Sequence, residues 1–408
     1  MDKTFYAGNR ARFLANMEPG TLAAFFSDRE IRKSADANYL FYADRNFVYL
    51  TGIEQKESVL LLGRDAEGNT WERLYLLPKD AMAERWPGRR LDTGEAYAVS
   101  GIQDVRSTAA FEEDLSGLLA AYDALYLDLF KQSGEDIDRP AHILANKLQG
   151  VNILNGNPMV RKLRTIKQPC EIEALRKAEE ITKEGILAMM RASKPGMYEY
   201  QYKAEFDRAL GQFGPKGQGF QSIISAGANN FCIHYDSYTG QAKDGDMVLN
   251  DVGAQWDNLI VDVSRGWPCN GTFTEKQKLL YECALKTSDH MFSIIRPGMK
   301  MADVDRTIRA YNAKLLVEAG VMETEEEVGT YMWHGGAHHI GFDVHDAVIT
   351  PEYLEPGMVF CVDVGIYHEA WGIGFRLEDN CLVTEDGCEN LSAAIPRTIE
   401  EIEADMAK

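Results

Sequence analysis

The sequence lacks any apolar run long enough to cross a membrane. Its longest apolar stretches, such as residues 58–62 and 247–249, have the length of strands, whereas a membrane helix needs about 20 mostly apolar residues. The first residues bring a charge at the second position and lack the apolar core and cleavage site of a secretory signal. We therefore expect a cytoplasmic protein with no membrane partner.

Cysteine pairs with metal-binding or redox spacing are absent as well. The seven cysteines include no Cys-x-x-Cys pair and are odd in number. Neither a disulfide framework nor a zinc ribbon is therefore indicated. We expect reduced thiols.

Basic residues are outnumbered by acidic ones. The chain has 43 Lys and Arg against 63 Asp and Glu, and its formal charge is −20. Sequence-independent nucleic-acid binding needs clustered basic residues that neutralise phosphates, so we expect no nucleic-acid partner. The acidity ordinarily serves solubility, and part of it can instead belong to carboxylates that bind metal ions.

The length of the chain indicates two domains, because 408 residues exceed the roughly 250 to 300 at which single cores stop growing. The first third alternates strand and helix patterns. The expected strands cover 22–26, 58–62, 74–77 and 124–127, and the expected helices cover 111–121 and 141–148. A long helix then begins after Gln168, with Pro169 in its first position. We predict an α+β protein with an α/β domain at 1–159 and a second domain at 160–408.

The second domain contains an internal repeat. The segment GDMVLNDVG at 245–253 recurs as GMVFCVDVG at 357–365. In both copies a glycine precedes an apolar strand that ends in Asp-Val-Gly. Such a repeat predicts two related α/β halves, whose repeated strands face each other with a site at their junction.

Each repeated strand is followed by a second apolar segment with another acid. Asp262 comes eleven residues after Asp251, and Glu378 comes fifteen residues after Asp363. A carboxylate among apolar side chains is costly to bury unless a cation or hydrogen bonds compensate it. Pairing with a nearby arginine explains any one of these acids equally well, but four acids in a duplicated pattern favour bound cations.

Four of the eight histidines fall in one segment, HGGAHHIGFDVHD. His334 and His338 have the spacing of a helical HExxH zinc motif, but the glutamate is missing and the glycines disfavour a helix. The segment therefore predicts a glycine-rich loop or strand edge. For His339 we expect a packed or hydrogen-bonded histidine. A carboxylate-rich site with imidazole suits Mn²⁺ or similar ions better than structural zinc.

These motifs resemble those of the pita-bread metallopeptidases, peptidase family M24, and most of all aminopeptidase P, over nearly the whole chain. The resemblance implies a creatinase-N-like α/β domain followed by a pseudo-symmetric pita-bread catalytic domain that binds two divalent metal ions. Asp251 matches the ligand of an Asp-x-Gly strand, and Asp262 matches that of an Asp-Val-Ser-Arg segment. His338 matches the second histidine of HGxxHxxGxxxHD, and Glu378 matches the acid of an Arg-Ile-Glu-Asp segment.

The fourth of the five implied ligands departs from the family pattern. Asp363 stands in an Asp-Val-Gly segment where the family has Glu-Pro-Gly, so the carboxylate is one methylene shorter. The resemblance implies that this residue binds one metal ion and takes a proton from the nucleophilic water. We expect metal binding to survive this change better than activity.

The resemblance also implies residues outside the ligand set. His234 in FCIHYD, His334 and His345 correspond to family histidines near the substrate, and Arg376 would orient the neighbouring carboxylates. Trp86 corresponds to a tryptophan that reaches the active site of a neighbouring subunit, which implies a homodimer or homotetramer. His234 and His345 would stabilise the oxyanion of the tetrahedral intermediate.

The implied activity is that of a metallo-aminopeptidase. A hydroxide bridging two metal ions would hydrolyse the N-terminal Xaa-Pro bond of peptides with proline in second position. A Xaa-Pro dipeptidase shares this fold and these ligands and stays open. A metal-binding protein with reduced or no peptidase activity also stays open, because of Asp363. A metal-free enzyme resembling creatinase is disfavoured, since that activity does not need the five-residue set.

Overall fold

The computed structural model describes residues 1–86, 88–130, 139–214 and 216–408. It divides into two compact units, Met1–Arg164 and Thr165–Lys408, and each has its own sheet and apolar core. The boundary predicted between residues 159 and 160 falls inside helix α6 (Asn157–Thr165), whereas the division follows Arg164.

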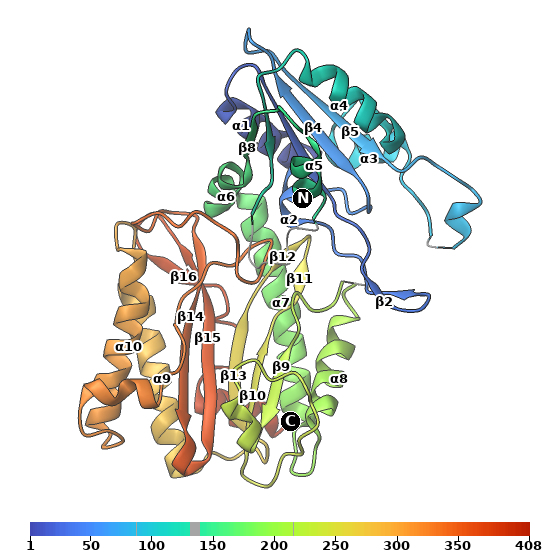
Figure 1. Cartoon of the computed structure of the whole chain (residues 1–408). Helices are drawn as coiled ribbons and strands as arrows, with labels where there is room; N and C mark the ends of the chain where they lie inside the picture. Colours follow the sequence, from blue (N-terminus) through green and yellow to red (C-terminus); the bar gives the residue numbers. More distant parts are fainter. Residues whose placement is uncertain (87, 131–138, 215) are drawn as a thin grey trace. The chain divides into compact units, whose positions relative to one another are not determined.

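The N-terminal unit contains a mixed six-stranded sheet in the order β6-β5-β4-β1-β7-β8 (Figure 1). Its strands are β1 (Thr21–Phe26), β4 (Val59–Arg64), β5 (Thr70–Leu76), β6 (Val105–Ser107), β7 (Ala124–Leu127) and β8 (Ile153–Asn155). A separate hairpin joins β2 (Arg32–Ser34) to β3 (Ala37–Asn38). The strands β1 and β4 are almost fully buried, as their continuous apolar sequence predicts. The α/β pattern expected for this part of the chain is confirmed.

Aspartates begin several helices of this unit. The side chain of Asp2 accepts from backbone amides at the start of α1, and those of Asp44 and Asp92 do the same for α2 and α3. These contacts satisfy N–H groups that have no partner within the helix. The helices are α1 (Lys3–Asn16), α2 (Arg45–Thr51), α3 (Thr93–Ser100), α4 (Phe111–Leu119) and α5 (Pro140–Lys147).

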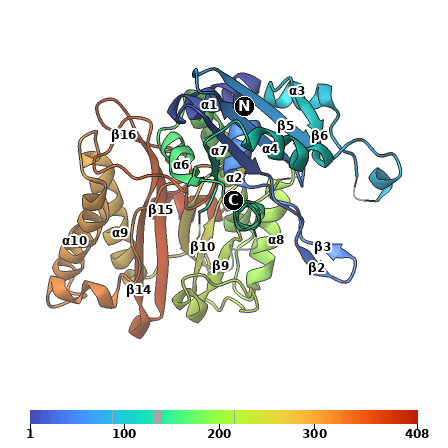
Figure 2. The same ribbon diagram turned by 45° about the horizontal axis from the view of Figure 1, so that its top comes forward.

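The C-terminal unit is built on a sheet in the order β14-β15-β13-β10-β9, with β16 beside β15. Its strands are β9 (Ile223–Ala226), β10 (Met247–Val252), β13 (Val263–Pro268), β14 (Val359–His368), β15 (Ile373–Val383) and β16 (Cys388–Asn390), with a small hairpin of β11 (Gln255–Trp256) and β12 (Leu259–Ile260). Its helices are α7 (Pro169–Ala192), α8 (Glu199–Leu210), α9 (Glu275–Ile294), α10 (Met301–Glu318) and α11 (Ile399–Met406). Helix α9 packs on β14 and β15, and α8 packs on β9 (Figures 1 and 2). The long helix predicted after Gln168 is α7.

The internal repeat corresponds to two antiparallel hairpins, β10–β13 and β14–β15. They join where Ser264 of β13 pairs with Glu378 of β15. The expectation that the repeated strands β10 and β14 face each other is wrong. They belong to one sheet and are separated by β13 and β15, because β10 pairs with β13 and β14 pairs with β15. Strand β14 also continues beyond Asp363 to His368, since the residues after the carboxylate are buried as well.

The glycines of the two Asp-Val-Gly segments are required by close contacts. A Cβ atom on Gly253 would lie 1.7 Å from the carbonyl oxygen of Val261, and one on Gly365 would lie 2.4 Å from Nε2 of His334. Only a residue without a side chain fits such distances. In both repeats, the backbone of the glycine in the Asp-Val-Gly segment therefore packs directly against a neighbouring segment.

Two expectations from composition can be compared with the fold. All seven cysteines are free thiols, as expected. Across the described ranges, no helix has both the length and the apolar composition needed to cross a membrane.

Candidate metal centre

A cavity of about 510 Å³ in the C-terminal unit is lined by the two hairpins and the histidine-rich loop. It brings together all the candidate site residues of this unit: His234, Asp251, Asp262, His334, His338, His345, Asp363, Arg376 and Glu378. Three of these come from β14 and β15, and the acids of the other hairpin lie on β10 and just before β13. The remaining candidate, Trp86, belongs to the N-terminal unit and is 90% exposed. Pro87 beside it lies outside the described residues.

The cavity contains carboxylate oxygens without compensation. Asp262, Asp363 and Glu378 are buried. One oxygen each of Asp251, Asp262 and Asp363 is buried and has no hydrogen-bond partner among the described residues. Burial, followed by the charges of Glu378 and Asp251, raises the pKa of Asp262 well above its usual value. Burial and the charge of Asp363 likewise raise the pKa of Glu378. Cations supply the compensation that such oxygens lack.

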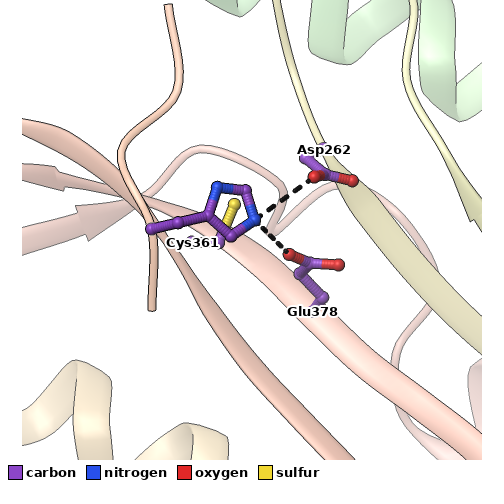
Figure 3. A group of neighbouring side chains, drawn as sticks. Asp262, Cys361 and Glu378 are labelled. Carbon is purple, nitrogen blue, oxygen red and sulfur yellow. Dashed lines mark ion pairs between the residues drawn. The ribbon is translucent and has the colours of Figure 1, made fainter. Parts of the chain in front are cut away.

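His338 lies between two of these carboxylates. Its Nε2 atom is 3.4 Å from Oδ2 of Asp262 and 3.6 Å from Oε1 of Glu378, and Figure 3 marks both ion pairs with dashed lines. Burial lowers the pKa of His338, but Cys361 and the two carboxylates outweigh it and the net shift is strongly upward. The imidazole is therefore held where carboxylate oxygens converge, which is the position of a metal ligand.

Cys361 was not predicted as a site residue. Its Sγ atom belongs to a group of four possible donor atoms, from Asp262, His338, Cys361 and Glu378, that lie within 4.8 Å of one another. The sequence does contain a signal for it. Cys361 stands two residues before Asp363 in β14, and side chains two apart in a strand share one face of the sheet.

Arg376 orients Asp251. Its Nη2 donates to Oδ2 of Asp251 at 2.7 Å, and its Nη1 donates to the hydroxyl of Tyr367 at 3.0 Å and to the carbonyl of Ile233 at 3.2 Å. The pairing leaves Oδ1 of Asp251 as the oxygen without a partner. The guanidinium fixes one edge of the carboxylate and leaves the other for a cation.

Asp363 is paired with a histidine. Oδ2 of Asp363 lies 3.2 Å from Nδ1 of His334, whose Nε2 lies 2.9 Å from the hydroxyl of Tyr367. Burial lowers the pKa of His334, but the charge of Asp363 outweighs it and the net shift is upward. Tyr367, which sequence reasoning missed, therefore contacts both His334 and Arg376.

Two further histidines differ in their surroundings. The ring of His345 stacks on that of His338, with centroids 3.9 Å apart. Burial and the charge of His338 lower the pKa of His345 to about 4, so this imidazole is neutral near pH 7. His339 is buried against Phe360, as expected for a packed histidine, and burial lowers its pKa to about 4.

A buried polar network supports the segment that holds Asp262. The backbone amide of Asp262 donates to the side-chain oxygen of Asn380 at 3.0 Å, and the backbone N–H of Asn380 donates to the hydroxyl of Ser392 at 2.9 Å. Ser392 in turn donates to Glu179 at 2.9 Å. Asp379 points to the other face, where it pairs with Arg265 at 2.7 Å and both side chains are fully buried. Such outer contacts fix the orientation of metal ligands.

The donor set therefore fits divalent cations. It combines buried carboxylates, one imidazole and three oxygens without partners in one cavity. Buried carboxylate oxygens with few nitrogen donors are the ligands of hard and borderline divalent ions.

The chain is similar to known proteins along nearly its whole length. Metallopeptidase family M24 matches residues 173–385, and the N-terminal domain of aminopeptidase P matches residues 6–126. The Xaa-Pro aminopeptidase of Escherichia coli is 30% identical over 424 residues, which cover 97% of this chain and 96% of that protein. That of Haemophilus influenzae is 30% identical over 427 residues, covering 99% and 97%.

Solved structures of similar fold point to the same family. A Bacillus anthracis protein assigned as an aminopeptidase P has a TM-score of 0.97 and 34% identity, covering 100% of this chain and 99% of that one. Aminopeptidase P from E. coli with the inhibitor Pro-Leu has a TM-score of 0.92 and 29% identity, covering 100% and 98%. This chain belongs to metallopeptidase family M24, in which it combines the pita-bread domain with an aminopeptidase P N-terminal domain, and it is a metallo-aminopeptidase.

Proposed function

We propose that this metallo-aminopeptidase hydrolyses the N-terminal Xaa-Pro bond of peptides with the help of two divalent metal ions. The observation that carries the proposal is the set of three buried carboxylate oxygens without partners in the cavity that also holds His338. The named activity of relatives that align along nearly the whole chain supports the choice of substrate.

Five residues would hold the two ions: Asp251, Asp262, His338, Asp363 and Glu378. Asp262 and Glu378 would act together with His338, since both carboxylates are buried and each lies within 4 Å of its Nε2 atom. Bound divalent ions lower the pKa of water and polarise a carbonyl. The carboxylate-rich set suits Mn²⁺.

The proton steps would fall to Asp363. Its carboxylate lines the cavity and can take a proton from the attacking water and return it to the leaving amine. His334, with Nδ1 3.2 Å from Oδ2 of Asp363, holds the carboxylate in place. Because the side chain of Asp363 is one methylene shorter than that of glutamate, this base reaches less far. The shorter reach supports a second candidate function, a metal-binding protein with reduced peptidase activity.

His345 and His234 would stabilise the charge that develops on the carbonyl oxygen. Both line the cavity. The neutral His345 imidazole carries one N–H near pH 7, and a fixed donor at that oxygen lowers the barrier. Arg376 acts through Asp251 and keeps it oriented.

Substrate contact by Trp86 and a dimeric or tetrameric assembly are parts of the same proposal. Both follow from the resemblance to aminopeptidase P, and the exposure of Trp86 is compatible with contact to a second copy.

Peptide length separates the proposed activity from its nearest rival. Hydrolysis of Xaa-Pro-Yaa and of Xaa-Pro would be compared after Mn²⁺ addition, with metal content measured on the same samples. We expect the tripeptide to be cleaved faster. Cleavage of the dipeptide alone would identify a dipeptidase, and two bound ions without any cleavage would identify a metal-binding protein without peptidase activity.

A further inference from the structure

Cys361 lies where a ligand of the metal centre would lie. Its side chain is fully buried, and its Sγ atom lies within 4.8 Å of donor atoms on Asp262, His338 and Glu378. Figure 3 draws the Cys361 sulfur behind the imidazole ring from which dashed lines run to the labelled Asp262 and Glu378. Among the described residues, this close group does not include Asp251 or Asp363. The thiol, rather than the shortened acid two residues later, therefore completes the group of donor atoms around His338.

The backbone fixes this position. Cys361 pairs with Asn380 across the β14–β15 ladder, two positions from the pair of Asp363 with Glu378, so all four side chains share one face. The amide of Cys361 donates to the carbonyl of His338 at 2.8 Å. The loop that carries the imidazole is thus hydrogen-bonded to the residue that carries the thiol.

The environment of the Cys361 sulfur includes polar groups. The Asn380 side-chain amide donates to Sγ at 3.5 Å, and Sγ lies within 4.8 Å of a nitrogen of His338. Burial raises the pKa of the Cys361 thiol well above its usual value, so a thiolate at this position requires a bound cation. A buried cysteine in an apolar core serves as a small hydrophobic residue. Here the sulfur instead accepts from one amide and lies within 4.8 Å of donor atoms on three candidate ligands.

We propose that Cys361 Sγ is a thiolate ligand of the ion held by Asp262, His338 and Glu378, and that it makes this half of the centre selective for softer divalent cations such as Zn²⁺, Co²⁺ and Cd²⁺. This inference rests on the metal centre of the proposed function and adds a donor to it. The S–H bond breaks as the sulfur–metal bond forms, and the proton leaves to solvent, so no oxidant is needed. Thiolate ligands favour softer ions over Mn²⁺.

Cobalt spectroscopy tests the bond directly. The metal-free full-length chain would be titrated with Co²⁺ while near-ultraviolet absorption is recorded, because a thiolate bound to Co²⁺ gives a sulfur-to-metal charge-transfer band. We expect a band that saturates with bound cobalt, disappears in Cys361→Ser and persists in Cys381→Ser. Cys381 is the matched control, since it is a buried cysteine of β15 adjacent to Asn380 and therefore on the opposite face.

Metal selectivity supplies a second readout. Competition between Cd²⁺ and Mn²⁺ would be measured by equilibrium dialysis on the same three proteins. We expect Cys361→Ser to lower the preference for Cd²⁺ by about tenfold or more, since even an outer contact to a ligand changes metal affinity about 10- to 100-fold. Cys381→Ser should leave it unchanged.

The outcomes separate this inference from the proposed function. Bound Co²⁺ without a charge-transfer band in the wild-type chain overturns the thiolate ligand, even where a variant fails to fold. Cleavage of Xaa-Pro-Yaa by that same protein leaves the proposed function intact. A band without peptide cleavage supports the ligand and overturns the function, and failure to bind any metal overturns both.

Discussion

Arg376 holds Asp251 by a 2.7 Å contact between Nη2 and Oδ2, and both side chains are largely buried. The same guanidinium also contacts Tyr367 and a backbone carbonyl. These three contacts need the planar fork of arginine, which a lysine cannot reproduce. The orientation of one candidate ligand therefore depends on a residue that touches no metal itself.

Arg376→Lys should weaken metal binding at the candidate centre while keeping a positive charge at this position. We expect metal affinity and kcat/KM for an Xaa-Pro-Yaa peptide to fall about 10- to 100-fold, as for other contacts that orient ligands. Metal titration and peptide kinetics measure the two effects. Arg397→Lys is the control, because Arg397 pairs with Asp379 on the other face of β15, and equal losses of metal affinity in both variants would contradict a specific role for Arg376.

Asp363→Glu should improve the proton step. The added methylene extends the carboxylate, which now pairs with His334 at 3.2 Å, farther into the cavity. A well-placed general base contributes about 10²- to 10⁴-fold, so we expect turnover with Mn²⁺ to rise about tenfold. Asp363→Asn is the matched variant, since it keeps the size of the side chain and removes the base. A lower turnover in the Glu variant than in wild type would show that the cavity is adapted to aspartate.

Glu179 should make stability depend on pH. Burial raises its pKa from 4.5 to about 8, so the folded chain keeps a proton that the unfolded chain loses. The contribution of the protonated Glu179 to the free energy of unfolding is complete below about pH 4.5. It is lost as the pH rises toward 8, by up to about 1.4 kcal/mol per pH unit. Glu179→Gln should flatten that part of the unfolding free-energy profile in urea.

The neighbouring Glu180 gives the control for this measurement, because its side chain is exposed. Glu180→Gln should leave the profile of the wild type unchanged. A profile that keeps its slope in Glu179→Gln would assign the pH dependence to another group.

Trp86→Ala should lower the catalytic activity of an oligomer and leave the stability of the fold nearly unchanged. The indole is 90% exposed, so little packing is lost and unfolding should change by less than about 0.5 kcal/mol. If Trp86 reaches the site of a second copy, kcat/KM for the tripeptide should fall about tenfold, the cost of losing one contact worth about 1.4 kcal/mol.

Light scattering would report the assembly in the same samples, and Met82→Ala is a matched control from the same segment, since Met82 is also exposed. A monomer with full activity, or an unchanged kcat/KM in Trp86→Ala, would refute contact across subunits.

The grouping of the four acids could be predicted from the sequence because of the repeat. Asp251 and Asp363 lie in the repeated strands β10 and β14, and Asp262 and Glu378 lie just before β13 and in β15, which pair with those strands. The sequence does not indicate which strand pairs with which in the sheet. The expected face-to-face arrangement of β10 and β14 failed because pairing with β13 and β15 depends on contacts far apart in the chain. The extension of β14 past Asp363 escaped prediction because the Asp-Val-Gly pattern is typical of a strand end, while burial continues the strand.

Single side chains without a motif were also beyond prediction. Cys361 in an apolar strand is typical of core packing. Its spacing from Asp363 indicates only the face of the sheet, and the fold is what brings its sulfur close to His338. Glu179 lies among charged residues of α7, where a glutamate normally faces water, yet Ser392 and the surrounding core bury it. In both cases the chemistry depends on the tertiary neighbour rather than on local sequence.

The β14–β15 ladder has a consequence for how the length of this hairpin can vary. Ten residue pairs, from Val359 with Leu382 to His368 with Ile373, set Asp363 opposite Glu378 independently of the turn at 369–372. A longer turn would leave those pairs in place. One residue inserted between Arg376 and Glu378 would turn Glu378 to the opposite face. Loop grafting is therefore compatible with this enzyme at the tip of the hairpin, whereas its strands tolerate no change of length.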